Sequence, residues 1–306
     1  MTTHTPLRCA NSFMVQRGSS EVVLMDTGAY PGFSSFLNET WTWNGTDWTN
    51  TGATLIDANG PLPGRINQVM AYDGYNVVLF GGQGGSASVG SLNDTWVWGG
   101  SSWTLKTPAT APFGRYGAEG CRTTTTALNV TMFGGFGGQG YLNETWKWDG
   151  YAQTWTLQSP TTSPSARVGH VMASGPAYTV LFGGSISSGE FKNDTWKYDG
   201  TTWTLQSPAA SPSCRGGACM AYDVTHARWV LFGGVNEYYN LPETWLYDGT
   251  TWTQAAPATS PSARKGAQMC WDSQSGKVLM FGGFSAADNY ASNHTWSWDG
   301  TTWTQL

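Results

Sequence analysis

Charged residues are scarce in this 306-residue chain. Asp, Glu, Lys and Arg together make up 11 % of it, and the formal net charge is −5. A chain with so few basic residues lacks the positive surface that general nucleic-acid binding requires. Long apolar runs are missing as well, because no stretch approaches the roughly 18 residues that span a membrane. We therefore expect neither nucleic acid nor a membrane as a partner.

Cysteine is also infrequent, and its spacing is not that of a metal site. The five cysteines include no Cys-x-x-Cys pair, and their odd number argues against a disulfide framework. The first residues, MTTHTPLRCANS, contain neither the basic nor the apolar segment of a signal peptide. We expect reduced thiols, no metal and no cofactor. We also expect a cytoplasmic protein, or a secreted one if a signal peptide has been removed.

Glycine and tryptophan are abundant instead, with 40 and 18 residues, a composition typical of many short strands joined by turns. A motif such as NDTWKYDGTTWT recurs six times at intervals of about 50 residues. Its first tryptophans are Trp41, Trp96, Trp146, Trp196, Trp245 and Trp296. A second tryptophan follows in each repeat, at Trp48, Trp103, Trp155, Trp203, Trp252 and Trp303. A fixed period of this length indicates a propeller or a solenoid.

Each repeat predicts four strands, here named A to D. Strand A follows an arginine, strand B is the VLFGG run, and strands C and D carry the two tryptophans around an Asp-Gly or Asn-Gly turn. A single four-stranded meander cannot bury both faces, whereas six arranged radially pack on one another. We therefore predict an all-β, six-bladed β-propeller in one domain, 1–306, and a monomer. The expected blades span 8–50, 65–106, 115–158, 167–206, 215–255 and 264–305.

The repeated residues resemble kelch repeats. Arg-x-Gly, then LFGG, then tryptophan at these spacings is similar to the kelch pattern, also found in the central domain of galactose oxidase. The resemblance covers about residues 8 to 305 and implies four-stranded antiparallel blades of kelch type. It also implies that the repeated tryptophans pack between blades. Blade 1 departs from the pattern, since VVLMDTG has Asp26 and Thr27 where two glycines are expected.

The connections between strands B and C vary most, and they share one face with the D–A links. Varied loops on a rigid scaffold usually carry the binding site. Aromatic residues outside the repeat pattern lie in these loops: Tyr30, Phe33, Tyr141, Phe191, Tyr238, Tyr239 and Tyr290. The arginines that begin strand A point to the same face: Arg8, Arg65, Arg115, Arg167, Arg215 and Arg264. In well-studied kelch domains, similar positions bind acidic peptides.

A structural role for these arginines is an equally serious interpretation. Each of the first five blades has an acid before strand C, namely Glu39, Asp94, Glu144, Asp194 and Glu243. These acids could form a ladder of ion pairs that serves the scaffold. Blade 6 has His294 at this position, so pairing within a blade would leave Arg264 free. We therefore expect Arg264 to be the best single candidate for ligand contact.

The sequence contains few combinations of residues typical of a catalytic site. Glu119, on strand A, is the one carboxylate expected to face the channel, and His294 is the other weak candidate. The most favoured function is a binding module for an acidic peptide or protein, or for an anionic glycan, on the B–C and D–A face. One alternative is an enzyme for a small anionic substrate, similar to kelch-type sugar-acid mutarotases or to a lyase. The other is a structural or assembly role. Catalysis is thus uncertain and disfavoured.

Overall fold

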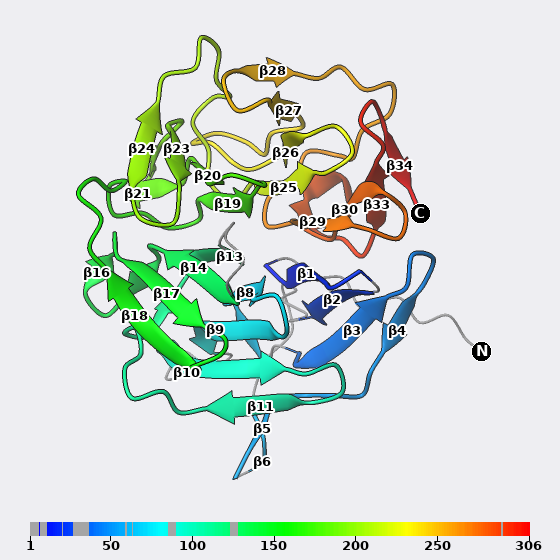
Figure 1. The fold of residues 1–306 in the computed structure, drawn as a ribbon. Helices are drawn as coiled ribbons and strands as arrows, with labels where there is room; N and C mark the ends of the chain where they lie inside the picture. Colours follow the sequence, from blue (N-terminus) through cyan, green and yellow to red (C-terminus); the bar gives the residue numbers. More distant parts are fainter. Residues whose placement is uncertain are drawn as a thin grey trace.

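The structure is a computed structural model that describes Pro6 and residues 11–19, 21–26, 37–58, 60–62, 64–84, 90–122, 128–288 and 290–306. Figure 1 shows its strands grouped around a central axis. Within the described residues, six four-stranded antiparallel meanders follow one another along the chain, one for each sequence repeat. The fold is therefore an all-β, six-bladed propeller, as the repeat period predicted.

The strands of each blade lie close to the expected positions. The innermost strands, A, are β1 (Phe13–Arg17), β8 (Val69–Tyr72), β13 (Glu119–Arg122), β19 (Val171–Ser174), β25 (Cys219–Asp223) and β29 (Gln268–Asp272). Strands B are β2 (Glu21–Asp26), β9 (Val77–Gly84), β14 (Asn129–Phe133), β20 (Thr179–Phe182), β26 (Arg228–Phe232) and β30 (Lys277–Phe281). Strands C are β3 (Glu39–Trp43), β10 (Ser91–Trp98), β17 (Thr145–Asp149), β23 (Thr195–Tyr198), β27 (Thr244–Tyr247) and β33 (Thr295–Trp298). Strands D are β4 (Trp48–Asn50), β11 (Trp103–Lys106), β18 (Thr154–Gln158), β24 (Trp203–Gln206), β28 (Trp252–Gln254) and β34 (Trp303–Gln305).

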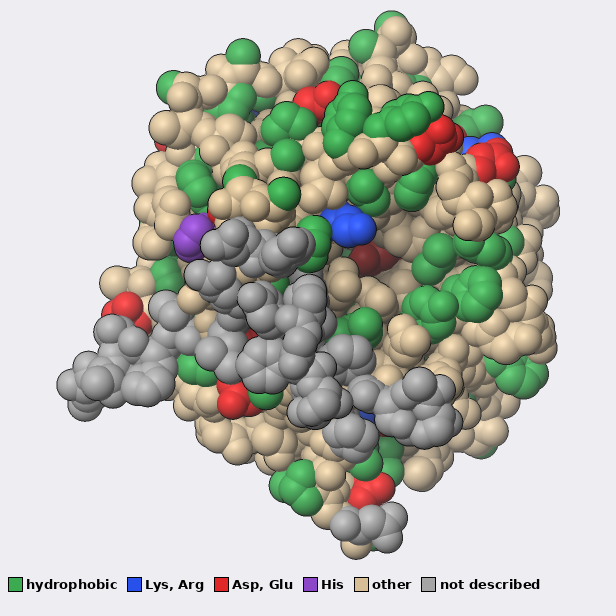
Figure 2. Space-filling view, turned by 180° about the vertical axis from the view of Figure 1, so that it is seen from behind, with side chains coloured by type: hydrophobic (Ala, Val, Ile, Leu, Met, Phe, Trp, Pro, Cys, Tyr) green, Lys and Arg blue, Asp and Glu red, His purple; other side chains and the backbone are tan. Residues whose placement is uncertain are grey.

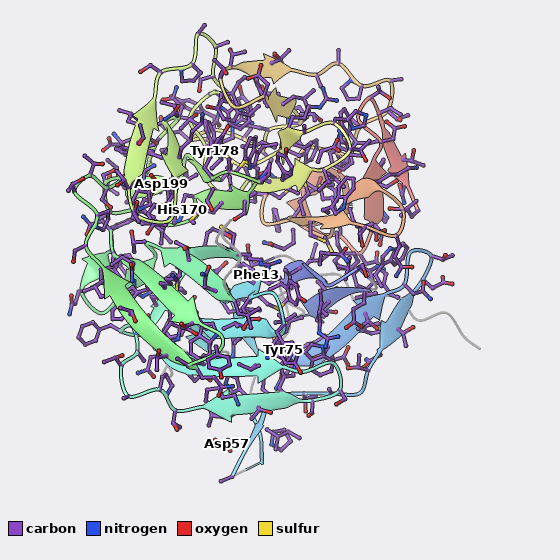
Figure 3. The ribbon with its side chains drawn as sticks, in the orientation of Figure 1. Phe13, Asp57, Tyr75, His170, Tyr178 and Asp199 are labelled. Atoms are coloured by element: carbon purple, nitrogen blue, oxygen red, sulfur yellow. The ribbon has the colours of Figure 1, made fainter. Side chains whose placement is uncertain are left out.

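Short elements decorate the D–A and B–C connections. They are β5 (Ile56–Asp57), β6 (Gly60–Pro61), β7 (Arg65–Ile66), β12 (Arg115–Tyr116), β15 (Phe136–Gly137), β16 (Gly140–Tyr141), β21 (Ser185–Ser187), β22 (Glu190–Phe191), β31 (Phe284–Ser285), β32 (Tyr290–Ala291) and the 3-10 turn η1 (Ala286–Asp288). The β5–β6 hairpin extends outward from the ring, with Asp57 at its periphery, whereas Phe13 lies near the centre (Figure 3). No helix in the described part of the chain is long and apolar enough to cross a membrane.

The hydrophobic core lies between neighbouring blades. One cluster joins Val78 and Phe80 of blade 2 to Met132 and Trp155 of blade 3, and similar clusters recur around the ring. The Phe80 ring meets the edge of Trp155 at a centroid distance of 5.3 Å, a favoured aromatic geometry. Strand B contributes the most deeply buried side chains because it is covered by a blade on either side. The repeated tryptophans thus pack between blades, as expected.

The second tryptophan of every repeat also donates a hydrogen bond across a blade boundary. Its indole Nε1 reaches the hydroxyl of the threonine that precedes the first tryptophan of the preceding blade, at 2.8 to 3.0 Å. The pairs are Trp48–Thr295, Trp103–Thr40, Trp155–Thr95, Trp203–Thr145, Trp252–Thr195 and Trp303–Thr244. A buried indole N–H needs such an acceptor, so the threonine recurs for a structural reason. This need accounts for the threonine that precedes the first tryptophan of each repeat.

A second set of bonds encircles the channel close to the start of the innermost strands. A residue shortly before strand A has a positive φ between 54° and 64° in every blade: Asn11, Asn67, Gly117, Gly169, Gly217 and Gly266. In blades 2 to 6 this residue stands two positions after the arginine. Glycine and asparagine adopt this left-handed conformation most readily. Backbone N–H groups at these positions donate to the equivalent carbonyl of the adjacent blade, at 2.8 to 3.0 Å. Five such bonds connect all six blades in series.

The ring closes where blade 6 meets blade 1, near the two ends of the chain. Asn11 donates its backbone N–H to the Gly266 carbonyl at 2.9 Å, and Trp48 donates to Thr295 at 2.9 Å. The inner strands β1 and β29 are also in contact, as are the other neighbouring pairs of inner strands. Among the described residues, closure therefore uses the same two kinds of bond as the boundaries between blades 2 and 3, 3 and 4, 4 and 5, and 5 and 6.

The register of blade 1 differs by one residue from the sequence alignment. Asn11 occupies the left-handed position that Asn67 occupies in blade 2, two residues after Arg65. Counting back two residues from Asn11 gives Cys9, so Arg8 is displaced from the repeat position of the other arginines. Arg8 itself lies outside the described residues. The role predicted for Arg8 at the channel mouth therefore stays a prediction.

Candidate functional site

The arginines at the start of strand A lie below the loop face. The five described ones are only 0 to 1 % exposed. Each forms an ion pair with an acid from the connection to strand C or from the start of that strand: Arg65–Asp94, Arg115–Glu144, Arg167–Asp194, Arg215–Glu243 and Arg264–Asp288. Each also donates a hydrogen bond to a backbone carbonyl in a Gly-Gly segment after strand B. This arrangement is the ladder that the sequence offered as the structural interpretation.

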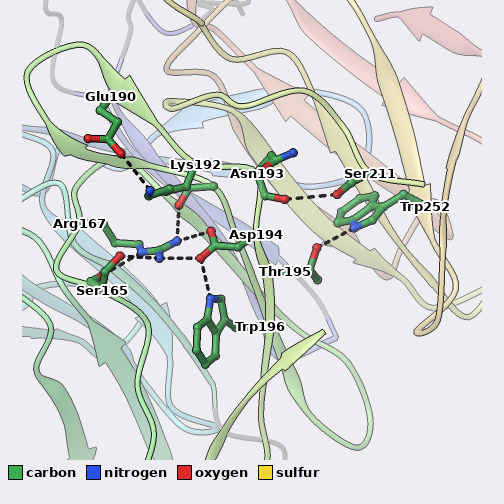
Figure 4. A network of polar contacts seen from close by, with 11 residues as sticks. Ser165, Arg167, Glu190, Lys192, Asn193, Asp194, Thr195, Trp196, Ser211 and Trp252 are labelled. Atoms are coloured by element: carbon green, nitrogen blue, oxygen red, sulfur yellow. Dashed lines mark hydrogen bonds and ion pairs between the residues drawn. The ribbon is translucent and has the colours of Figure 1, made fainter. Parts of the chain in front are cut away.

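Blade 4 shows the network in detail (Figure 4). Arg167 donates from Nη1 and Nη2 to the two carboxylate oxygens of Asp194, at 2.7 and 2.8 Å. Its Nε donates to the Ser165 carbonyl at 3.0 Å. Asp194 also accepts from the Trp196 indole at 2.8 Å. Burial by itself would raise the pKa of Asp194, but the hydrogen bonds and the positive charge of Arg167 outweigh it and lower that pKa.

The expectation that Arg264 is unpaired is wrong. Its Nη2 donates to the Asp288 carboxylate at 2.8 Å, and the Ser262 carbonyl and hydroxyl and the Gly282 carbonyl are further acceptors. Asp288 comes from the 3-10 turn η1 in the B–C connection rather than from the repeat position that His294 fills. The charge of a buried guanidinium needs a carboxylate, and this loop supplies it from another point of the chain.

His294 keeps the rim position that the acids hold in the other blades. Its side chain is 39 % exposed, and Nδ1 lies 3.9 Å from the Asp288 carboxylate. One consequence is that the Trp296 indole N–H, which has an acid partner in the other blades, has no partner here. His294 does not line the central cavity, so the structure does not bring it together with Glu119.

The predicted aromatic residues fall into separate groups on the loop face. Tyr141 packs edge-on against Phe136 at 5.1 Å, and Phe136 in turn lies 5.6 Å from Tyr116. Tyr238 and Tyr239, in the blade 5 loop, are 81 % and 61 % exposed. Sequence reasoning missed Tyr116 and Phe136, although both stand in the same variable segments.

The other predicted loop aromatics are less exposed, or their side chains are not part of the described structure. Phe191 is half-buried and comes from β22 in blade 4. Tyr290 belongs to β32, and only its backbone is described. Tyr30 and Phe33 lie outside the described residues. The part of these residues in ligand binding stays a prediction.

A cavity of about 270 Å³ occupies the centre of the ring. Residues of all six inner strands line it, and one strand position supplies methionine in five blades: Met14, Met70, Met172, Met220 and Met269. Three cysteines add further sulfur to the wall, namely Cys121, Cys219 and Cys270. Burial raises the pKa of Cys121 to about 11 and that of Cys219 to about 12, so both thiols are neutral at pH 7. The wall is largely apolar.

Glu119 is the only carboxylate that lines this cavity among the described residues. It is the first residue of β13 and therefore lies toward the loop face. No hydrogen bond or ion pair joins its carboxyl group to a described residue, and burial raises its pKa to about 8. Arg122 lies at the opposite end of the same strand and also lines the cavity. The expectation that Glu119 faces the channel is confirmed.

The face opposite to that of Figure 1 is hollowed near its middle (Figure 2). An acidic side chain is visible below the surface in this hollow, next to a basic one and to several hydrophobic side chains. A second cleft of about 240 Å³ lies in blade 2 between the β5–β6 hairpin and the Arg65–Asp94 pair. Within the described part of the chain, no group of three or more His, Cys, Asp and Glu residues could hold a metal ion.

Comparison with known proteins agrees with this architecture. Residues 100–257, about half of the chain, match the family model of the KLHDC2/KLHL20/DRC7 Kelch-repeats domain. Among solved structures, the chain is similar to the one titled "Structure of YjhT", with a TM-score of 0.77 and 15 % sequence identity. That alignment covers 99 % of this chain and 98 % of YjhT, which at this identity is a likeness of fold alone. No curated protein sequence matches the chain.

Proposed function

Because the chain belongs to the KLHDC2/KLHL20/DRC7 kelch-repeat family, we propose that it is a protein-interaction module that binds a polypeptide segment on its B–C and D–A face. The observation that carries this proposal is the exposure of Tyr238 and Tyr239 on a B–C loop. Two adjacent tyrosine rings on one loop supply a large contact area at low entropic cost.

The loop that presents these tyrosines is held in shape by its own hydrogen bonds. The Asn236 side chain accepts from the backbone N–H groups of both Tyr238 and Tyr239, each at 2.9 Å. An Asn side chain that closes a turn in this way restricts the backbone. Preorganisation of this kind lowers the entropy lost on binding, which supports a contact role for the two rings.

The charge of a partner that fits this face depends on whether the arginines or the acids of the ion pairs are exposed. In blade 3 the Glu144 side chain is 27 % exposed while the Arg115 side chain is 0 % exposed, and blades 2, 4 and 5 repeat this difference. An acidic peptide or anionic glycan would have to displace a carboxylate from a buried guanidinium. We therefore propose the aromatic residues as primary contacts, and the acidic partner stays a prediction from the sequence, as do the monomeric state and the cellular location.

The test is selection from a displayed library of extended peptides at two salt concentrations. The variant Tyr238→Ser/Tyr239→Ser removes both rings, and Tyr151→Ser is the matched control because Tyr151 is 90 % exposed in a C–D turn on the opposite face. We expect the double variant to lose at least tenfold in affinity for selected peptides and the control to bind like the wild type. Equal binding by all three proteins would refute the assignment of this face. Enrichment of acidic peptides that weaken with salt would confirm the anionic partner.

Catalysis on a small substrate is a second candidate, favoured by one observation. Glu119 faces the cavity, and its pKa of about 8 makes it a plausible proton carrier near neutral pH. The assay is NMR exchange between the anomers of a sugar acid, with Glu119→Gln as the variant. Exchange faster than the uncatalysed rate that disappears in the variant would establish an enzyme. Exchange at the uncatalysed rate would refute catalysis on this substrate, and the interaction module would remain the one proposed function.

A further inference from the structure

The central cavity has an acid at one end, a base at the other and a largely apolar wall between them. Glu119 supplies the only described carboxylate, Arg122 is the basic residue, and methionine, cysteine and aromatic residues make up about half of the remaining lining. We propose that this cavity binds a primary alkylammonium group, with the Glu119 carboxylate as its counter-ion and the methionine-rich wall around its alkyl stem. The proposal concerns the channel and is independent of the peptide-binding face.

The first argument is the missing partner of Glu119. Each described arginine at the channel mouth is already held by a carboxylate and a backbone carbonyl. No such group reaches Glu119, although polar groups in protein interiors are normally paired. Glu119 is partly exposed to the channel, and a carboxyl without a partner on the wall of a cavity of about 270 Å³ gains a favourable ion pair when a cation enters. An ammonium group is a compact cation with three donors, which suits a single carboxylate.

The second argument is the volume of the cavity and the flexibility of the side chains that line it. Five methionines occupy the same position of strand A; they pack mainly between blades, and their flexible thioethers also contribute to the cavity wall, where they adapt to an alkyl chain. Tyr72, Tyr222 and Trp271 line the cavity at the strand position of Arg122, so they add apolar surface at the end remote from Glu119. A volume of this size accommodates a short alkylamine or the side chain of one lysine, but not a folded segment.

The third argument is the polarity along the channel axis. Glu119 and Arg122 begin and end the same four-residue strand, so the acid lies toward the loop face and the base toward the opposite face. Arg122 is exposed and lies 5.9 Å from the Tyr72 ring. A cation is therefore attracted at one end and repelled at the other, which fixes the direction in which an alkylamine enters.

Glu119 is also the described group in the cavity whose charge would change on binding. The other titratable residues that line the cavity in the described part of the chain are the three cysteines, Tyr72, Tyr222 and Arg122. Arg17, Asp223 and Asp272 end inner strands but do not line it. Burial raises the pKa of Cys121, Cys219 and Cys270, and it also raises that of Tyr222, so these four groups are neutral at pH 7. Burial raises the pKa of Glu119 to about 8, so it is mostly protonated at pH 7 in the empty cavity. An incoming ammonium group would lower this pKa and release about 0.9 proton per ligand to the buffer.

The experiment is isothermal titration of the protein with n-butylammonium at pH 7 in two buffers of different ionisation enthalpy. We expect saturable binding with release of nearly one proton. Glu119→Gln keeps the size of the side chain but removes its charge, so affinity should fall at least tenfold and proton release should vanish. n-Butyrate should not bind, because its charge has the wrong sign.

A relocated carboxylate separates the role of the charge from a loss of folding. Gln268 occupies the same strand position in blade 6, on the opposite side of the ring, and also lines the cavity. Adding Gln268→Glu to Glu119→Gln should therefore restore binding of n-butylammonium. Failure of the wild type to bind, or unchanged affinity in Glu119→Gln, would overturn the proposal. An unfolded Glu119→Gln protein would be recognised by circular dichroism, and Gln268→Glu alone would then have to increase the affinity.

The source of the amine is distinguished by a second titration. Nα-acetyl-lysine methylamide presents the same alkylammonium group on a peptide backbone. Tighter binding of this compound than of n-butylammonium would identify a lysine side chain of a partner protein, and weaker binding would identify a free small amine. Either result, together with loss in Glu119→Gln, supports the site. Absence of binding by both compounds refutes it, whatever the outcome of the peptide selection on the loop face.

Discussion

Replacing Asp194 by alanine tests whether the arginine ladder serves the scaffold. The substitution removes two hydrogen bonds to Arg167 and one to the Trp196 indole. It leaves the Arg167 guanidinium 0 % exposed, with only backbone carbonyls and the Ser165 hydroxyl as acceptors. The positive charge would then be buried without a counter-ion.

The magnitude follows from the burial of the two partners. Removing one partner of a fully buried pair costs about 3 to 5 kcal/mol. We expect the lower end, about 3 kcal/mol, because the Asp194 side chain is 25 % exposed and water can partly replace it. The assay is urea unfolding followed by tryptophan fluorescence, with Asp199→Ala as control. Asp199 is an exposed acid whose Oδ1 accepts hydrogen bonds from Thr201 and Thr202 in the C–D turn. Its loss should cost about 1 kcal/mol, because it leaves no buried charge behind.

The pH dependence gives an independent check. The pKa of Asp194 is lowered in the folded protein, so the pair adds stability above the ordinary carboxyl pKa near 3.8. This contribution is lost as the pH falls through the lowered value. The difference in free energy of unfolding between wild type and Asp194→Ala should therefore shrink below about pH 4. A destabilisation by Asp194→Ala of less than about 1 kcal/mol at pH 7 would refute the scaffold role. A destabilisation that does not change with pH would refute it as well.

Three further predictions concern other parts of the ring. Trp252→Phe keeps most of the buried ring but leaves the Thr195 hydroxyl without its donor, so the free energy of unfolding should fall by about 1 to 2 kcal/mol in urea titrations. Gly184→Ala places a Cβ 2.8 Å from the Cβ of His170 at a φ of +93°. The free energy of unfolding should therefore fall by about 1 to 3 kcal/mol, which thermal unfolding would record as a melting temperature lower by several degrees. Glu119→Gln should flatten the pH dependence of stability. The raised pKa makes the wild type lose stability between about pH 4.5 and pH 8, and the neutral amide removes that loss.

The sequence predicted the blades well because the information is local and repeated. The period, the paired tryptophans and the turns between strands C and D each specify a short segment, and the structure places those segments as expected. The orientation of Glu119 was also predictable from its place on an innermost strand. The buried ladder could be foreseen as an alternative, since each acid stands 27 to 29 residues after its arginine in four described blades.

The errors arose where a residue acts outside the repeat. Asp288 neutralises Arg264 from a loop whose sequence has no counterpart in the other blades, so no periodic signal pointed to it. The one-residue shift of Arg8 is visible only through the left-handed backbone of Asn11, which the repeat alignment does not encode. The Trp–Thr bonds were missed for a different reason. The threonine partner belongs to the neighbouring blade, about 60 residues away in the sequence.

The backbone hydrogen bonds that connect Asn11, Asn67, Gly117, Gly169, Gly217 and Gly266 have a consequence for how the channel can change by mutation. They join main-chain groups, so substitutions of the neighbouring channel side chains leave these donors and acceptors in place. Mutation can therefore exchange the residues that line the channel, such as Glu119 or Gln268, while these bonds and the number of blades remain constant. Different groups therefore determine the ligand selectivity of the channel and the integrity of the ring, so a new ligand preference can evolve without a change of fold.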